Sequence, residues 1–121
     1  MKTNHLFIRI NTTTRRDRQD ALDAARNFFV SSGAWIVDYR MLSNNSICYQ
    51  FEVEFRDVPS LHLYLAQTEF NVLEESQNQL HAIHALGQAR NLNPDHIVRG
   101  TFQITFIHND PDLVLDVPPF E

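Results

Sequence analysis

The sequence is poor in the features that most directly reveal a function or a cellular location. It holds one cysteine, Cys48, so no disulfide can form within the chain. Only three glycines occur in 121 residues, and there is no Gly-rich phosphate loop, nucleophile elbow or metalloprotease helix. Neither an apolar signal region after Met1 nor a membrane-length apolar run is present. The lack of signal and membrane segments predicts a cytoplasmic protein with no membrane contact. The sequence also contains no complete catalytic motif.

Acidic residues outnumber basic residues in this sequence. Ten lysines and arginines stand against 15 aspartates and glutamates, which gives a formal net charge of −5 at pH 7. Because a phosphate backbone would meet net repulsion, we expect no nucleic-acid partner. Apolar residues make up 43% of the chain, enough for one packed core. We therefore expect a single domain over residues 1–110 and an acidic, apolar tail over residues 111–121, which forms an edge strand or an arm.

Two runs of alternating residues predict a β-hairpin. Apolar side chains recur at every second position in Trp35–Leu42 and again in Ile47–Phe55. The runs flank Ser43-Asn44-Asn45-Ser46, and asparagine tolerates the positive φ angles that short hairpin turns need. Because a two-stranded ribbon is not stable by itself, the rest of the chain must supply more strands and a layer of helices.

The remaining segments provide both. Alternation predicts one strand at Leu6–Ile10 and another over residues 101–108, and helical spacing of apolar residues predicts helices at Arg15–Ser32 and Glu74–Arg90. Leu61–Thr68 fits either a strand or a helix, and the nearby Pro59 favours a short helix.

The first helix carries signals at both of its ends. Thr14 stands three residues before Asp17, the spacing of a capping box. Gly33 follows the last apolar turn, where a left-handed residue commonly ends a helix.

The order of these elements predicts an α+β fold of the ferredoxin-like type, β-α-β-β-α-β. It would have a four-stranded antiparallel sheet, helices on one face and an extra helical segment before the last strand. The first strand would lie beside the third, so Arg9 is expected to meet Glu52 or Gln50, with Arg40 approaching the same carboxylates from the other side. The open face would be polar, with Phe7 as its exception.

The segment from Arg26 to Arg40, with Gly33 near its middle, resembles the helix, glycine and second strand of ACT domains. The resemblance implies a small ferredoxin-like regulatory module that pairs as a homodimer and binds an amino acid. An acidic, apolar tail and a polar sheet face interrupted by Phe7 also favour a homodimer.

Polar groups gather between the first strand and the first helix. Asn11, Thr12, Thr13 and Thr14 are expected to form a turn that offers an amide and three hydroxyls at the positive end of a helix, with Arg15 next to it. The alternative is a helix cap with spare hydroxyls. These five residues are the candidate ligand-binding site, for a small anion or carboxylate and without a cofactor.

The candidates for chemistry are few. His81 and His84 share one face of a predicted helix, but no third ligand follows at helical spacing, which favours solvated histidines over a metal site. Cys48 shares its strand face with Glu52 and Glu54, which would raise the pKa of the thiol, so we expect an inert cysteine.

No residue is therefore assigned to catalysis or to a metal. Three functions stay open: a ligand-binding regulatory module, a non-enzymatic structural or protein-interaction domain, and a small enzyme or metal-binding protein that uses His81 and His84. The absence of a complete catalytic set favours the first.

Overall fold

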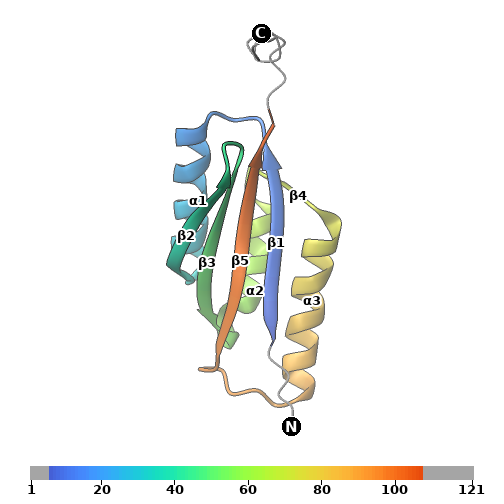
Figure 1. Ribbon diagram of the computed structural model, residues 1–121. Helices are drawn as coiled ribbons and strands as arrows, with labels where there is room; N and C mark the ends of the chain where they lie inside the picture. The colour runs from blue at the N-terminus through green and yellow to red at the C-terminus, as the bar shows by residue number, and fades with distance from the viewer. Residues whose placement is uncertain (1–5, 108–121) are drawn as a thin grey trace, which may run out of the picture.

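The four segments predicted as strands and one further short strand, which the sequence did not predict, form one mixed sheet of five strands (Figure 1). The computed structural model describes residues 6–107. The strands are β1 (Phe7–Thr14), β2 (Trp35–Ser43), β3 (Ser46–Glu54), β4 (Asn71–Val72) and β5 (Ile97–Phe106). Their order across the sheet is β2-β3-β5-β1-β4. β1 and β5 run parallel, and the other neighbouring strands are antiparallel.

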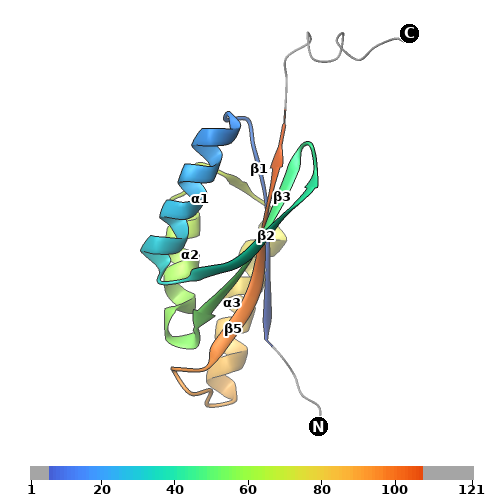
Figure 2. The same cartoon turned by 60° about the vertical axis from the view of Figure 1, so that its left-hand side comes forward.

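Three helices and a short 3-10 turn complete the fold. They are α1 (Arg18–Ser32), η1 (Phe55–Asp57), α2 (Val58–Ala66) and α3 (Glu74–Ala89). Figure 2 shows α1 and α2 on the same side of the sheet, while α3 packs against α2 and β1. No helix of the described chain covers the opposite face of the sheet. Within residues 6–107, none of these helices has both the length and the apolar character to cross a membrane.

The predicted α+β class is confirmed, but the predicted strand pairing is wrong. β5 lies between β1 and β3, so the sheet is five-stranded and mixed instead of four-stranded and antiparallel. The two helices predicted before the last strand are present as α2 and α3, and each reverses the chain between β3 and β5, whereas the ferredoxin-like order assumes one reversal there. As a result, β5 enters the sheet antiparallel to β3 and parallel to β1.

Aromatic side chains fill the space between α1 and the sheet. The ring of Phe29 lies 5.3 Å from that of Phe51, 5.4 Å from that of Phe102 and 5.7 Å from that of Tyr49, measured between centroids. Phe70 approaches Phe102 at 5.5 Å from the α2 side. These distances suit edge-to-face and tilted pairs, which add to the stabilisation from burial alone. One core therefore joins β1, β3, β5 and the helices.

The segment expected to be a turn is the second half of β1. Asn11 to Thr14 continue the parallel ladder against Gln103 to Phe106 of β5. Thr12 and Thr14 face the core at 2% and 5% exposure, positions that suit β-branched residues. α1 accordingly begins at Arg18 instead of Arg15, and the predicted capping box is absent because the Thr14 hydroxyl accepts a hydrogen bond from the Arg16 N–H.

Several of the other predicted boundaries are confirmed. Gly33 ends α1 in the left-handed region at φ 82°, and the helix predicted at Leu61–Thr68 is α2.

The hairpin of β2 and β3 is also confirmed, but its turn does not use an asparagine with positive φ. In the described chain, positive φ outside glycine occurs only at Asn91. The hairpin turn is held instead by Arg18, whose Nη2 donates to the carbonyl of Asn44 at 2.6 Å. The predicted tail at 111–121 lies outside the described residues.

The β1 edge of the sheet is covered by α3 and the residues before it. The backbone N–H of Arg9 donates to Gln79 Oε1 at 2.6 Å, and that of Asn11 donates to Ser76 Oγ at 2.9 Å. The carbonyl of Asn11 accepts the N–H of Leu73 at 3.1 Å. Side chains of α3 thus occupy backbone groups that an edge strand would otherwise leave free.

Two glycines leave room for phenylalanine rings. A Cβ at Gly100 would lie 2.7 Å from the ring of Phe51 and 2.7 Å from the carbonyl oxygen of Ile8. A Cβ at Gly87, in α3, would overlap the ring of Phe55. The ring of Phe55 also stacks on His84 at 5.6 Å between centroids. Both positions require glycine for space.

Gly87→Ala tests this packing. In an ordinary helix interior this change raises the free energy of unfolding by roughly 0.5–1 kcal/mol. Here the clash with Phe55 should lower it by about 1–3 kcal/mol, a typical cost of overpacking, as measured by urea denaturation.

The same substitution in a Phe55→Ala background is the control. Without the ring, the alanine should stabilise the protein relative to its own parent. A stabilising Gly87→Ala in the wild-type background would contradict the described contact.

Candidate functional site

The open face of the sheet carries its side chains in rows that cross four strands. Trp35 of β2 stands opposite Glu52 of β3, which stands opposite Arg99 of β5, which stands opposite Phe7 of β1. The strand order and register alone bring these four residues into line, because residues directly opposite each other point to the same face. This row is the candidate functional site.

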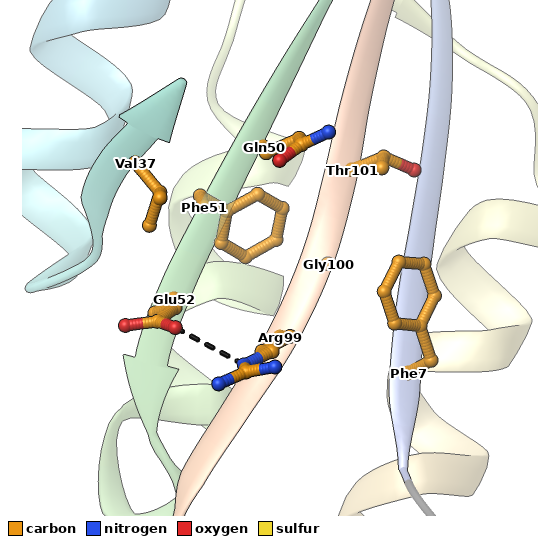
Figure 3. Close-up of a pocket in the computed structure, with 8 residues that line it drawn as sticks. All are labelled: Phe7, Val37, Gln50, Phe51, Glu52, Arg99, Gly100 and Thr101. Carbon is orange, nitrogen blue, oxygen red and sulfur yellow. Dashed lines mark hydrogen bonds and ion pairs between the residues drawn. The ribbon is translucent and has the colours of Figure 1, made fainter. Parts of the chain in front are cut away.

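A hollow of about 430 Å³ opens beside this row (Figure 3). Val37, in an irregular part of β2, and Phe7 of β1 form apolar walls on its two sides. Between them lie the polar groups of Gln50, Glu52, Arg99 and Thr101. The ring of Phe51 forms part of the lining. It packs against β5 at Gly100, where a side chain would clash with it. An apolar wall with a few convergent polar groups is the usual composition of a small-molecule site.

Both oxygens of the Glu52 carboxylate are held in place. Arg99 Nε donates to Oε2 at 3.1 Å, and the indole Nε1 of Trp35 donates to Oε1 at 3.2 Å. The Glu52 side chain is 23% exposed, whereas that of Arg99 is 75% exposed. An ion pair this accessible contributes about 0–1 kcal/mol, so a ligand with its own charges can replace the pairing at little cost.

The predicted partners of Glu52 are corrected by the strand order. Arg9 stands opposite Thr101 instead of Glu52 or Gln50, because β5 separates β1 from β3. The guanidinium of Arg9 lies over the ring of Phe7, 4.8 Å from its centroid. Arg40 stands opposite Cys48, away from the carboxylates.

Arg99 was missed by sequence reasoning because Gly100 hides the start of β5. The predicted strand began at residue 101, where the apolar alternation resumes. If glycine is counted as an inward position, Val98, Gly100 and Phe102 alternate without interruption, and Arg99 then falls on the open face. Trp35 was expected in a strand, but its hydrogen bond to Glu52 depends on a register that the sequence does not specify.

The five predicted ligand-binding residues do not form one site. Thr12 and Thr14 are buried on the helix-covered side, and the Thr12 hydroxyl donates to the Gln103 carbonyl at 3.0 Å. The backbone of Asn11 is engaged by Ser76 and Leu73.

The other two predicted residues, with the edge of Thr14, lie at a second hollow of about 520 Å³. It is lined by Thr13, Thr14, Arg15, Arg16, Glu69, Asn71 and Ile107. Most of its polar groups already have partners: Arg16 pairs with Glu69, and the Thr13 hydroxyl accepts from Asn71 Nδ2 at 3.2 Å. Among residues 6–107, Ile107 is the only large apolar residue of this lining, so the hollow lacks the apolar walls of the first.

Cys48 lies half-buried on the open face, one row from Gln50. Burial raises the pKa of its thiol, and the nearby Arg40 guanidinium offsets part of that rise. The direction agrees with the sequence-based prediction, but the cause is desolvation instead of the neighbouring glutamates. A thiol of this kind is a poor nucleophile at neutral pH.

The two helix histidines are separated by their surroundings. His81 is exposed, whereas His84 is partly buried against Phe55. Across residues 6–107, no three histidine, cysteine, aspartate or glutamate side chains gather closely enough to hold a metal ion.

Comparison of the chain with protein-family models, curated proteins and solved structures finds no match. The resemblance of Arg26 to Arg40 to ACT domains therefore stays a prediction.

The pH profile of Cys48 alkylation tests the electrostatics of this face. The rate with iodoacetamide should rise with a midpoint above the ordinary pKa of a cysteine thiol, because burial favours the neutral form. Folding raises the pKa of the Cys48 thiol, so the protonated thiol stabilises the fold at pH values below its pKa in the unfolded chain. This stabilisation should be lost as the pH rises through the pKa of the folded protein.

Arg40→Ala removes the positive charge that lowers this pKa, so the midpoint should move further upward. A midpoint below that of a free thiol, or a downward shift in Arg40→Ala, would contradict the assignment. Gln50→Ala, a neutral change on the same strand face, is the matched control.

Proposed function

We propose that the protein is a small-ligand-binding domain whose open-face hollow takes a zwitterionic, amino-acid-like molecule in a regulatory role. The observation that carries the proposal is the Glu52–Arg99 pair, 3.1 Å apart at the edge of a hollow with apolar walls. A free amino acid presents a carboxylate and an ammonium group close together, and an adjacent cation and anion are their complement.

Each part of the hollow has a role in this proposal. The guanidinium of Arg99 receives the ligand carboxylate, and Glu52, already oriented by Trp35, receives the ammonium group. Phe7 and Val37 contact the ligand side chain, and Thr101 and Gln50 offer further hydrogen bonds. The site prefers ligands that carry both charges, since either charge alone would leave one member of the pair without a partner.

We further propose that the domain works as a homodimer, in keeping with the resemblance to ACT domains and with β2, whose nine residues are all exposed. The same exposed strand favours a second candidate function, a non-enzymatic protein-interaction domain. In that case the open-face hollow would bind no amino acid.

A thermal-shift panel of the twenty amino acids tests ligand binding. A ligand present at a hundred times its dissociation constant stabilises a fold by about 2.7 kcal/mol, which is a rise in melting temperature on the order of 10 °C for a domain of this size. The N-acetylated and amidated forms of an active amino acid should each give a much smaller shift, because each lacks one charge.

Single substitutions then place the site. Arg99→Gln and Glu52→Gln should each weaken binding at least about tenfold, since a hydrogen bond to a charged group contributes roughly 1.5–3 kcal/mol. Arg15→Gln, at the second hollow, is the matched control and should leave the shift unchanged. No response to any amino acid, or a response lost only in Arg15→Gln, would overturn the proposal.

A further inference from the structure

The two long edges of the sheet are treated differently. At the β1 edge, Gln79 and Ser76 of α3 and the short strand β4 occupy backbone groups. At the β2 edge no strand of the described chain lies beyond, and all nine residues of β2 are exposed (Figure 1). A free edge presents unpaired N–H and C=O groups, which are a template for another strand.

The exposed β2 edge is also unusually apolar. Eleven large hydrophobic residues are exposed in residues 6–107, and six of them lie on this one strand. They are Trp35, Ile36, Val37, Tyr39, Met41 and Leu42. β2 contains neither lysine nor proline, the residues with which proteins commonly block such edges. The concentration of apolar residues on an unblocked edge marks an interaction surface.

The charges of β2 are complementary to those of a second copy of the chain. Asp38 and Arg40 flank Tyr39, which is the midpoint of the nine-residue strand. Among the described residues, no ion pair includes either Asp38 or Arg40. Resting on the proposed homodimer, we infer that β2 pairs antiparallel with β2 of a second copy about a two-fold axis at Tyr39, so that each Asp38 faces the Arg40 of the other copy.

The two-fold symmetry restricts the register. Residues directly opposite each other must share a sheet face, so the register can change only in steps that keep the faces matched. A shift in one direction sets the two Asp38 carboxylates against each other, and a shift in the other direction sets the two Arg40 guanidinium groups against each other. Of these registers, only the one centred on Tyr39 places opposite charges next to each other.

The backbone N–H of Tyr39, at the midpoint of β2, can take part in this pairing. The N–H of Tyr39 donates to the Asp38 carboxylate of its own strand at 2.8 Å. In the pair, Asp38 turns to the partner's Arg40, and the Tyr39 N–H becomes free for a carbonyl of the neighbouring strand. Irregular pairing with β3 between Ile36 and Asp38 and between Met41 and Ser43 limits the regular ladder to the centre of β2. The apolar residues on both sides of this centre are buried by contact with the partner.

Sedimentation equilibrium on the full chain is the first test. The wild-type protein should have twice the 14.1 kDa chain mass at tens of micromolar. Asp38→Arg and Arg40→Asp should each weaken the dimer about tenfold or more, because both symmetric pairs become repulsive. An equal mixture of the two variants should restore association, since each copy then offers the charge that the other needs. The double variant should also be a dimer.

A cross-link tests the register independently of the charges. In a Cys48→Ser background, Tyr39→Cys should form a disulfide between two copies on mild oxidation, because opposed residues lie within the Cα separation that a disulfide spans. Met41→Cys is the matched control: its two copies would be offset by four residues, about 13 Å along the strand, and should not cross-link.

These experiments distinguish the homodimer, the β2 interface and the register of the two strands. A wild-type monomer overturns both the homodimer and this interface, and would leave the β2 edge to a strand of a different protein. A wild-type dimer that survives Asp38→Arg and does not cross-link through Tyr39→Cys overturns the β2 interface while the homodimer stands. Failure of the mixed variants to associate, or cross-linking through Met41→Cys, overturns the register. Far-UV circular dichroism of each variant verifies folding, and none of these results depends on amino-acid binding.

Discussion

The position of β5 between β3 and β1 is the constraint on which the rest of the structure depends. It places Phe102 at the centre of the aromatic core, where the rings of Phe28, Phe29 and Phe70 meet it from the helix side. It also requires glycine at position 100, because the ring of Phe51 lies against the β5 backbone there. On the opposite face the same strand brings Arg99 between Glu52 and Phe7. Core, hollow and ion pair are therefore consequences of one strand insertion.

Local patterns predicted most of the elements but not their arrangement. The hairpin of β2 and β3, the left-handed Gly33, the helix with Pro59 in its first turn and the helix after Leu73 follow from alternation, helical spacing and breaker residues. Periodicity predicted both helices between β3 and β5, but it does not specify which strands become neighbours in the sheet. The threonines after Ile10 show a different limit: a polar β-branched run suits a turn or a strand equally, and pairing with β5 decided it.

The candidate site was harder to predict than the fold. Glu52 and Phe7 were expected on a polar face, but their neighbours there come from strands that are distant in sequence. The threonine-rich run attracted attention because it concentrates hydroxyl groups, yet the strand pleat turns Thr12 and Thr14 into the core and their hydrogen bonds stay within the protein. The exposed β2 edge was not recognised from the sequence for a related reason. An alternating apolar strand looks the same whether it lies inside a sheet or at its border, and only the strand order shows that β2 is at the edge.

Nuclear Overhauser contacts across the sheet test the central claim, the insertion of β5, most directly. With β5 between β3 and β1, Thr101 should show cross-strand contacts to both Gln50 and Arg9. No contact should join Arg9 to Gln50 or Glu52, since a whole strand separates them and neighbouring strands are about 4.8 Å apart. Direct contacts between Arg9 and Gln50, with Thr101 touching only one of the two strands, would contradict the arrangement and with it the hollow beside Arg99.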